Sequence, residues 1–276
     1  MKISLSMWSV HKLWFNNEWD TVDFIDFASQ TPAEGVELLS CFWKNKEEEI
    51  PRIQEALSKA NLPVACFCAC NNFGSITSQD WETALKDVKD SIDMAVLFGS
   101  KVVRVFSGDQ AKGTTFEQAK EQIIKGLKAS SEYAEERGIT LCLENHGLFA
   151  GQSDQVLEII DQVGSSSLRS TFDTGNFLLV NEDPTDAITK LKSQVAHVHF
   201  KDFLKVEPSY KGETYQALNG DKFKGTIVGD GQVDLTFILS NLKQLDYQGW
   251  LTVEFEGEEE PKYGSIESIK RLQELL

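Results

Sequence analysis

The chain has no long apolar run and no excess of basic residues, and each of these absences excludes a class of protein. No apolar stretch approaches the roughly 20 residues that a helix needs to cross a bilayer, so no membrane span or membrane partner is expected. The 27 Lys and Arg are outnumbered by 43 Asp and Glu, which gives a formal charge of −16. Nucleic-acid binding normally requires a basic surface, so a DNA or RNA partner is not expected either.

The sequence also lacks the marks of secretion and of a zinc-finger site. Its first residues, MKISLSMWSV, contain no hydrophobic segment followed by a small-residue cleavage site, which predicts a cytoplasmic protein. Cys66, Cys68 and Cys70 alternate as on one face of a strand, whereas zinc sites use CxxC-type spacing. Cys142 falls inside another predicted strand and Cys41 just after one. We therefore predict buried, reduced thiols.

Strand-like and helix-like segments alternate from one end of the chain to the other. Strands are predicted at 3–8, 34–39, 62–70, 101–106, 139–144, 168–173, 194–200 and 250–255. Helices are predicted at about 20–30, 47–60, 79–98, 115–137, from about 153, and at about 184–192, 234–246 and 264–276. Such alternation implies parallel strands joined by right-handed crossovers, and eight strands close a barrel. We predict an α/β protein with one (β/α)8 TIM-barrel domain over residues 1–276; a doubly wound open sheet is the alternative.

Four potential metal ligands lie near the C-terminal ends of the last four predicted strands. Glu144 ends ITLCLE and Asp173 ends LRSTFD, while His199 lies in QVAHVHF and Glu254 in WLTVEF. In a parallel barrel these side chains would converge at the mouth, where the active sites of such barrels lie. This ligand set suits one Mn²⁺ or Mg²⁺ best and tolerates Co²⁺, Zn²⁺ or Fe²⁺.

One connection is unusually long. About 30 residues separate the seventh strand from its helix, from Lys201 to Val233. Connections of this length are uncommon unless they are functional. This one leaves the end of the barrel that carries the predicted ligands, so we predict a lid or a substrate-contacting segment there, or part of a subunit interface in a possible homo-oligomer.

Several short sequences together resemble a known superfamily. LENHG, FDTGN, HVHFKD, GDGQVD and TVEFEG are similar to those of the xylose-isomerase-like barrels. These barrels include sugar and sugar-phosphate isomerases and epimerases, ketose 3-epimerases and keto-inositol isomerases or dehydratases, with endonuclease IV as a distant relative. The resemblance implies that the metal ligands are Glu144, Asp173, His199 and Glu254. It also implies that the two glutamates are the catalytic acid/base pair.

Other polar residues near these strand ends are candidates for substrate binding. His146 lies two residues after Glu144 and is interpreted either as a substrate contact or as a histidine packed at the rim. His197 lies two residues before His199, on the same strand face, and is expected to donate a hydrogen bond to a ligand or to a substrate oxygen. Asn176 stands where the ketose 3-epimerases carry histidine, so the sequence departs from that pattern.

Two lysines, one tryptophan and one arginine complete the candidate site. Lys201 and Lys205 follow the seventh strand and could bind an anionic or polyol oxygen; Lys205 falls where the ketose epimerases place a substrate-binding arginine. Trp14, in the first loop, is the aromatic residue we expect to contact a sugar. Arg104 lies inside the fourth strand and requires a carboxylate partner, either within the barrel or at the site.

These residues predict a divalent-metal-dependent isomerase or epimerase that acts on a small sugar, a keto-polyol or their phosphates, and that moves a proton through an enediolate. The alternative is a lyase, because the same enediolate can expel a β-hydroxyl group, as in a dehydratase. An endonuclease IV-like nuclease requires more histidine ligands than a chain with four histidines offers, and a basic groove. A non-catalytic sugar-binding barrel is disfavoured because both glutamates are present.

Overall fold

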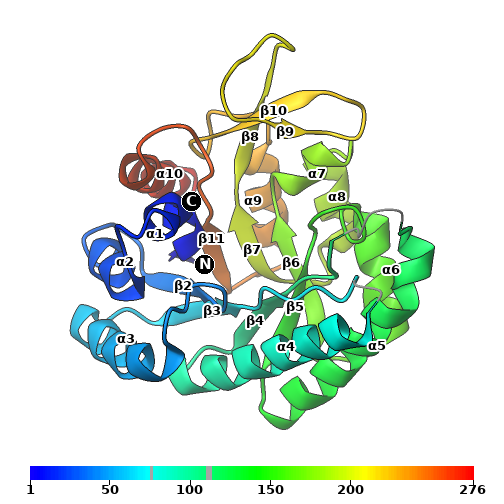
Figure 1. Cartoon of the computed structure of the whole chain (residues 1–276). Coiled ribbons are helices and arrows are strands. Elements are labelled where there is room, and N and C mark those ends of the chain that lie inside the picture. The colour runs from blue at the N-terminus through cyan, green and yellow to red at the C-terminus, as the bar shows by residue number, and fades with distance from the viewer. Residues whose placement is uncertain (75–76, 110–113) are drawn as a thin grey trace.

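Eight parallel strands close into a barrel that is surrounded by helices (Figure 1). The computed structural model describes residues 1–74, 77–109 and 114–276. The order of neighbouring strands around the barrel is β1-β11-β7-β6-β5-β4-β3-β2. The barrel strands are β1 (Lys2–Ser6), β2 (Gly35–Leu39), β3 (Val64–Cys68), β4 (Val102–Val105), β5 (Thr140–Glu144), β6 (Leu168–Asp173), β7 (Val195–Phe200) and β11 (Trp250–Val253). This closure confirms the predicted TIM barrel and excludes the open sheet.

The helices follow the strands in the order that the sequence predicts. They are α1 (His11–Phe15), α2 (Thr21–Ala28), α3 (Lys46–Ala60), α4 (Ser78–Phe98), α5 (Phe116–Glu136), α6 (Ser153–Val163), α7 (Asn176–Leu179), α8 (Pro184–Leu191), α9 (Leu235–Gln244) and α10 (Pro261–Leu275), with a short 3₁₀ turn, η1 (Met7–Val10). Gly99 adopts a left-handed conformation (φ 77°) and ends α4. No described helix is long and apolar enough to pass through a bilayer.

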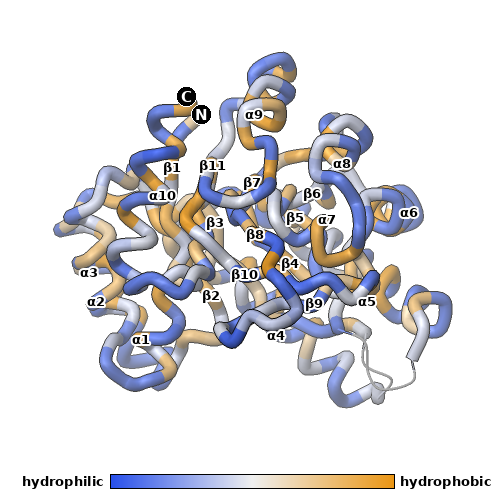
Figure 2. The backbone as a smooth tube through the Cα atoms, turned by 90° about the horizontal axis from the view of Figure 1, so that it is seen from above, coloured by the Kyte–Doolittle hydropathy of each residue, from blue (hydrophilic) through white to orange (hydrophobic). Residues whose placement is uncertain are grey.

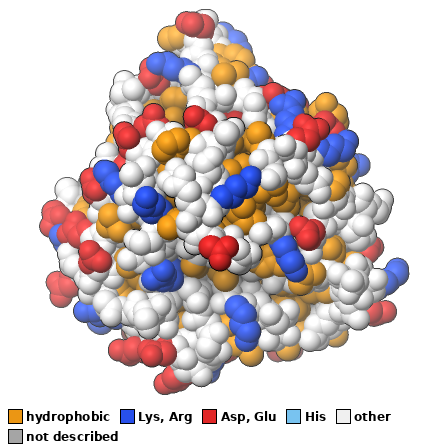
Figure 3. Space-filling model, turned by 180° about the vertical axis from the view of Figure 1, so that it is seen from behind, with side chains coloured by type: hydrophobic (Ala, Val, Ile, Leu, Met, Phe, Trp, Pro, Cys, Tyr) orange, Lys and Arg blue, Asp and Glu red, His pale blue; other side chains and the backbone are white. Residues whose placement is uncertain are grey.

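Both faces of the barrel strands are buried, which explains their nearly continuous apolar sequences. In β5, Leu141 and Leu143 alternate with Cys142 and Glu144, and all four are at most 2% exposed. The helices bury one apolar face each; α6 does so with Val156, Ile159, Ile160 and Val163. Seen from above, the helices lie around the outside and the strands occupy the centre (Figure 2). From behind, acidic and basic side chains are interspersed (Figure 3).

The prediction of buried thiols is confirmed for three cysteines and wrong for two. Cys66, Cys68 and Cys142 have no exposed surface, as expected for residues inside barrel strands. Cys41 is exposed and Cys70 is half-buried. The reason is that β2 ends at Leu39 and β3 at Cys68, so both residues lie beyond the strands at the open end of the barrel.

The long connection after β7 is an ordered substructure. It contains a three-stranded antiparallel sheet formed by β8 (Asp202–Val206), β9 (Tyr215–Gln216) and β10 (Lys222–Thr226), with β10 in the middle. Figures 1 and 2 place this sheet above the C-terminal end of the barrel. A bridge between Gly225 and Gly257 attaches it to the segment after β11.

The carboxylate of Asp202 holds the end of this connection in place, where the chain returns to the barrel. Asp202 Oδ1 accepts hydrogen bonds from the backbone N–H groups of Phe203 and Val233, at 2.9 and 3.2 Å. Its Oδ2 accepts from Gly229 and Gly231, at 3.0 and 2.9 Å. Asp202 is 1% exposed, so these four donors replace the water that the carboxylate loses on folding.

We expect Asp202→Ala to lower the free energy of unfolding by about 1–3 kcal/mol, because four backbone donors lose their acceptor. Denaturant unfolding measures the effect, and limited proteolysis should cut the variant within 227–233. Asp221→Ala is the matched control, because Asp221 lies in the same connection but pairs with Lys205 at the surface; it should change stability by less than about 0.5 kcal/mol. Equal losses in the two variants would contradict this role for Asp202.

Candidate metal centre and active site

The four predicted ligands come together at the C-terminal end of the barrel. Glu144 ends β5, Asp173 ends β6, His199 lies in β7 and Glu254 directly follows β11. One potential ligand atom from each lies within 4.8 Å of the others. His199 Nδ1 is 3.6 Å from Glu144 Oε2, 3.9 Å from Asp173 Oδ2 and 3.8 Å from Glu254 Oε2. The side chains thus form one buried cluster.

Strand register and a tight turn aim these groups at one another. Asp173 lies directly beside His199 in the β6–β7 pair. The turn after β6 then donates the backbone N–H groups of Gly175 and Asn176 to Asp173 Oδ1, at 2.9 and 2.8 Å. These bonds fix the carboxylate so that its other oxygen, Oδ2, faces the cluster.

The cluster has the properties of a site for a divalent cation. Asp173 Oδ2 and His199 Nδ1 are buried, and neither has a hydrogen-bond partner among the described residues. Buried polar atoms without a partner raise the free energy of the folded state unless a bound ligand interacts with them. Oxygen and nitrogen donors of this kind fit Mn²⁺ or Mg²⁺ and are compatible with Zn²⁺ or Fe²⁺. The residues present therefore fit one divalent metal ion.

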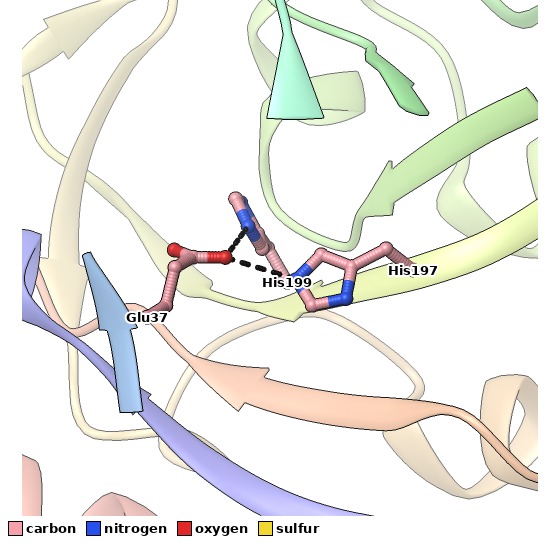
Figure 4. Close-up of side chains that lie close together, drawn as sticks. All are labelled: Glu37, His197 and His199. Atoms are coloured by element: carbon pink, nitrogen blue, oxygen red, sulfur yellow. Dashed lines mark hydrogen bonds and ion pairs between the residues drawn. The ribbon is translucent and has the colours of Figure 1, made fainter. Parts of the chain in front are cut away.

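A buried glutamate that the sequence analysis missed orients His199. Glu37, on β2, is 0% exposed, and its Oε2 lies 2.9 Å from His197 Nε2 and 3.0 Å from His199 Nε2 (Figure 4). A hydrogen bond from the His199 Nε2–H to this carboxylate leaves Nδ1 as the atom that faces the cluster. Burial opposes the charge on Glu37, but His199 and the bonds from both histidines outweigh it and hold its pKa well below the usual range.

His197 therefore lies deeper in the barrel than the cluster and contacts Glu37. Its side chain has no exposed surface and does not line the cavity described below. Its Nε2 also lies 3.1 Å from Thr252 Oγ1. The expected hydrogen bond to a ligand or a substrate oxygen is thus made to Glu37 instead, because β2 carries its carboxylate to the same depth inside the barrel. In the sequence, Glu37 stands in an apolar run (GVELL), and this placement of a charge in a barrel strand is the only signal that it gives.

Arg104 is the charge partner of Glu144. Its Nε lies 3.0 Å from Glu144 Oε2, and both side chains are at most 3% exposed. Asn176 donates from Nδ2 to the other oxygen, Glu144 Oε1, at 3.2 Å. Burial alone would raise the pKa of Glu144, but His199 and Arg104 reverse the direction and lower it. Asn176 and Arg104 thus hold Glu144 ionised and in a fixed position.

Lys201 is the charge partner of Glu254. Its Nζ lies 2.7 Å from Glu254 Oε2, 3.5 Å from Asp173 Oδ2 and 3.2 Å from Glu256 Oε1. Lys201 is 4% exposed. Burial opposes its charge, but Asp173 and the two glutamates outweigh burial and raise the pKa of Lys201 well above the usual range. Lys201 is therefore held as an ammonium group among these carboxylates.

Glu256, a second residue that the sequence analysis missed, connects the site to the long connection. It accepts a hydrogen bond from Trp8 Nε1. Tyr215, on β9, faces the same carboxylate; burial and the charge of Glu256 raise the pKa of Tyr215. The signal in the sequence is its alternation with Glu254 in VEFEG, which points both side chains to one side.

A cavity of about 420 Å³ opens onto the cluster. It is lined by Trp8, Phe15, Leu39, Cys41, Cys70, Arg104, Phe106, Glu144, His146, Lys201, Glu254 and Glu256. This volume and the mixture of aromatic and charged walls suit a small polar molecule.

Three predicted substrate contacts have different positions in the structure. His146 lines the cavity, with its ring centroid 4.6 Å from that of Phe106. Trp14 does not line it; its ring packs on Phe42 at 4.9 Å, and the aromatic residues of the wall are Trp8, Phe15 and Phe106.

Lys205 is also absent from the cavity wall. Its Nζ lies 2.6 Å from Asp221 Oδ2, and half of the side chain is exposed. The reason is that β8 begins at Asp202 and pairs with β10, which carries Lys205 away from the mouth.

Comparison with known proteins agrees with this fold. A family model described as "Xylose isomerase-like TIM barrel" matches residues 25–275, and the chain belongs to this family. The inosose dehydratase of Clostridium perfringens (strain 13 / Type A) is 25% identical over 264 residues, which cover 86% of this chain and 87% of the relative. That of Mesomycoplasma hyopneumoniae (strain 7448) is 28% identical over 273 residues, covering 91% and 86%.

Solved structures with the same fold include both epimerase-like proteins and dehydratases. A D-tagatose 3-epimerase-like protein aligns with a TM-score of 0.78 at 19% identity, covering 100% of this chain and 97% of that one. The probable 3-DHS dehydratase AsbF from Bacillus anthracis aligns at 0.76 with 19% identity, covering 99% of both chains. The IOLI protein, solved with a bound zinc atom, aligns at 0.76 with 15% identity, covering 100% and 96%.

We expect the affinity for Mn²⁺ to fall as the pH decreases below about 7. Burial raises the pKa of Asp173 to about 7, with Glu144 and Glu254 adding to the effect and Lys201 opposing it. Below that pH a proton occupies the carboxylate, and the cation must displace it, so affinity should drop up to about tenfold per pH unit. Calorimetry on metal-free protein at several pH values in buffers of different ionisation enthalpy measures affinity and proton release together. A pH-independent affinity between pH 5.5 and 8 would contradict this prediction.

We also expect Glu37→Gln to weaken Mn²⁺ binding by roughly 10–100-fold, because a neutral amide oxygen accepts hydrogen bonds from the two imidazole N–H groups more weakly than the carboxylate does. Thr252→Val is the matched control: it removes a hydroxyl group whose hydrogen bonds are to His197 and Ser4, and it should leave affinity within about threefold. Nitrogen NMR of labelled histidine in metal-free protein should show a changed His199 tautomer only in the Glu37 variant. Unchanged affinity with an unchanged tautomer would show that Glu37 does not orient the ligand.

Proposed function

We propose that this protein is a divalent-metal-dependent enzyme that removes a proton beside the carbonyl group of a small polyhydroxylated ketone and expels a neighbouring hydroxyl group as water. The observation that carries this proposal is the different cationic partner of each glutamate. Glu254 contacts Lys201 at 2.7 Å, whereas Glu144 contacts Arg104 at 3.0 Å. An ammonium group can release a proton, but an arginine guanidinium does not.

The two halves of the reaction fit this asymmetry. Glu144, Asp173, His199 and Glu254 would hold the metal ion, which supplies a Lewis acid that polarises the substrate carbonyl and acidifies the adjacent C–H bond. Glu254 faces the cavity and accepts that proton as the base. Lys201, in contact with Glu254, donates a proton to the departing hydroxyl group.

Glu144 contributes in a different way. Arg104 and Asn176 both hold its ionised form, so it binds and orients rather than returning a proton to the substrate. Epimerisation requires a proton donor on each face of the substrate, and this side of the site does not offer one in the arrangement described. The names of the curated relatives, inosose dehydratases, support the same choice.

The cavity favours an uncharged substrate. Arg104 and Lys201 are the Lys and Arg residues that line it, and carboxylates occupy both. Lys205, which could have bound a phosphate, is paired with Asp221 outside the cavity. We therefore propose a free keto-polyol or keto-sugar. The aromatic walls, Trp8, Phe15 and Phe106, would pack against its C–H faces.

A second candidate is the isomerase or epimerase that the sequence predicts. It is favoured by one observation, that Glu144 and Glu254 both line the same cavity. A panel of keto-inositols, keto-sugars and their phosphates, incubated with Mn²⁺ in D₂O, separates the two reactions. Loss of water identifies the dehydratase, and a product of unchanged formula that contains solvent deuterium identifies the isomerase or epimerase.

We expect Glu254→Gln to abolish turnover and solvent deuterium exchange while weakening Mn²⁺ binding less than Asp173→Ala does, because glutamine keeps an oxygen donor but loses its basicity. Lys201→Met should retain exchange and lose dehydration by about 100-fold or more, since the base remains and the acid is gone. Mass spectrometry of the product and of deuterium in recovered substrate measures both. Normal exchange in Glu254→Gln, or normal dehydration in Lys201→Met, would overturn these roles.

A further inference from the structure

Two cysteines that the proposed reaction does not use lie side by side at the ends of neighbouring strands. In the β2–β3 pair, Leu39 is directly beside Cys68. The alignment continues beyond the strands, because Ser40 N–H donates to the Cys68 carbonyl at 2.8 Å and Cys70 N–H donates to Ser40 Oγ at 3.0 Å. Cys41 and Cys70 are therefore neighbours one step past the barrel. Adjacent strands have the Cα separation that a disulfide spans.

Both thiols face space that small molecules can enter. Cys41 and Cys70 line the catalytic cavity and also a second cavity beside it, whose walls include Ser40, Asn71 and Asp87. Cys41 is exposed and Cys70 half-buried. The pair thus forms part of the wall between the two cavities, within reach of a reagent in solution.

The surroundings make Cys70 the more reactive thiol. A hydrogen bond from the Cys41 thiol and the nearby Arg104 lower the pKa of Cys70 to about 7, against burial and the Asp87 carboxylate. The Arg104 guanidinium lies close because its Nη1 donates to the carbonyl of Ala69, the preceding residue, at 2.8 Å. Thiolates next to a cation and open to solvent are the nucleophiles of thiol chemistry.

We propose that Cys41 and Cys70 form a redox-active thiol pair on the wall of the catalytic cavity, which oxidants of the disulfide class, such as oxidised glutathione, close to a disulfide. The Cys70 thiolate attacks one sulfur of the oxidant and releases one glutathione thiolate, leaving a mixed disulfide on Cys70. The Cys41 thiol then gives its proton to the released glutathione thiolate and attacks the Cys70 sulfur, which breaks the bond to the second glutathione and releases it as a thiolate that takes a proton from water. The two protein thiols are oxidised, and the oxidant is reduced to two thiols.

The other cysteines serve as internal controls. Cys66 and Cys68 have sulfur atoms 3.9 Å apart, but neither has any exposed surface, and burial raises the pKa of both thiols. Cys142 is likewise buried, and burial raises the pKa of its thiol. If proximity alone decided which cysteines form a disulfide, Cys66 and Cys68 would pair. If the thiols must also be accessible to the oxidant and one of them must be a thiolate, Cys41 and Cys70 pair instead.

The experiment treats the chain of residues 1–276 with oxidised glutathione near pH 7.5 and maps tryptic peptides without reduction. Fragment-ion sequencing of the linked peptides identifies the cysteine involved, because Cys66 and Cys68 lie in the same peptide as Cys70. The expected product joins the peptide 13–44, through Cys41, to the peptide 60–86, through Cys70, and dithiothreitol reverses it. Cys41→Ser should accumulate glutathione on Cys70, because nothing resolves the mixed disulfide. Cys70→Ser should react at least roughly tenfold more slowly than wild type, because the thiolate is missing.

Mn²⁺ binding provides an independent readout. Neither cysteine belongs to the predicted ligand set, so the oxidised protein should bind Mn²⁺ within about threefold of the reduced protein. A cross-link confined to Cys66 and Cys68, glutathione accumulating on Cys41 in place of Cys70, or no reaction at any cysteine would overturn the proposal. Because wild-type peptide mapping alone decides between these outcomes, the test does not depend on the serine variants folding.

Discussion

The concentration of buried negative charge at the mouth of the barrel is the constraint on which the rest of the site depends. Glu144, Asp173 and Glu254 are each at most 4% exposed, and unpaired carboxylates in such a place would be strongly destabilising. Among the described residues, Arg104 and Lys201 are the lysine and arginine side chains that contact these three carboxylates. Two cations against three carboxylates, with Glu256 also in contact with Lys201, leave a net negative site that favours a divalent cation.

The same constraint explains why the two sides of the cavity differ chemically. Arginine binds a carboxylate with a rigid fork and keeps its protons, so Glu144 is fixed as an anion. Lysine has exchangeable protons on a flexible stem, so Glu254 and Lys201 together can accept and donate. Beneath them, Glu37 holds two histidines in place and determines which imidazole nitrogen faces the cluster. The cations that make the buried carboxylates tolerable in the folded barrel are thus the same residues that set the proposed chemical role of each glutamate.

The fold and the four clustered residues could be predicted because strands and parallel barrels follow simple periodic rules. The predicted strand at 139–144 matches β5 to within one residue, and the position of Glu144 at its end follows directly. The partners could not be predicted, because they depend on which strands are neighbours in space. Glu37 is more than 150 residues from His197 and His199, and nothing in its local sequence indicates that contact.

The positions of side chains in the connections between barrel strands are harder to predict for a related physical reason. The sequence predicts Trp14 to lie in the first loop, whereas in the structure it lies in α1 and packs on Phe42, outside the cavity that Phe15 lines. Lys205 was placed at the mouth because it follows β7, but β8 carries it outward to Asp221. Where the backbone goes after a strand depends on tertiary contacts such as those of Asp202, which single-sequence patterns do not encode.

Anomalous diffraction from crystals of the protein soaked in Mn²⁺ tests the central claim most directly. The account predicts one strong anomalous peak per chain, bonded to Glu144, Asp173 and Glu254 oxygens and to Nδ1 of His199, at roughly 2.0–2.6 Å. A peak bonded through His199 Nε2, a peak elsewhere on the chain, or no peak at saturating Mn²⁺ would contradict it.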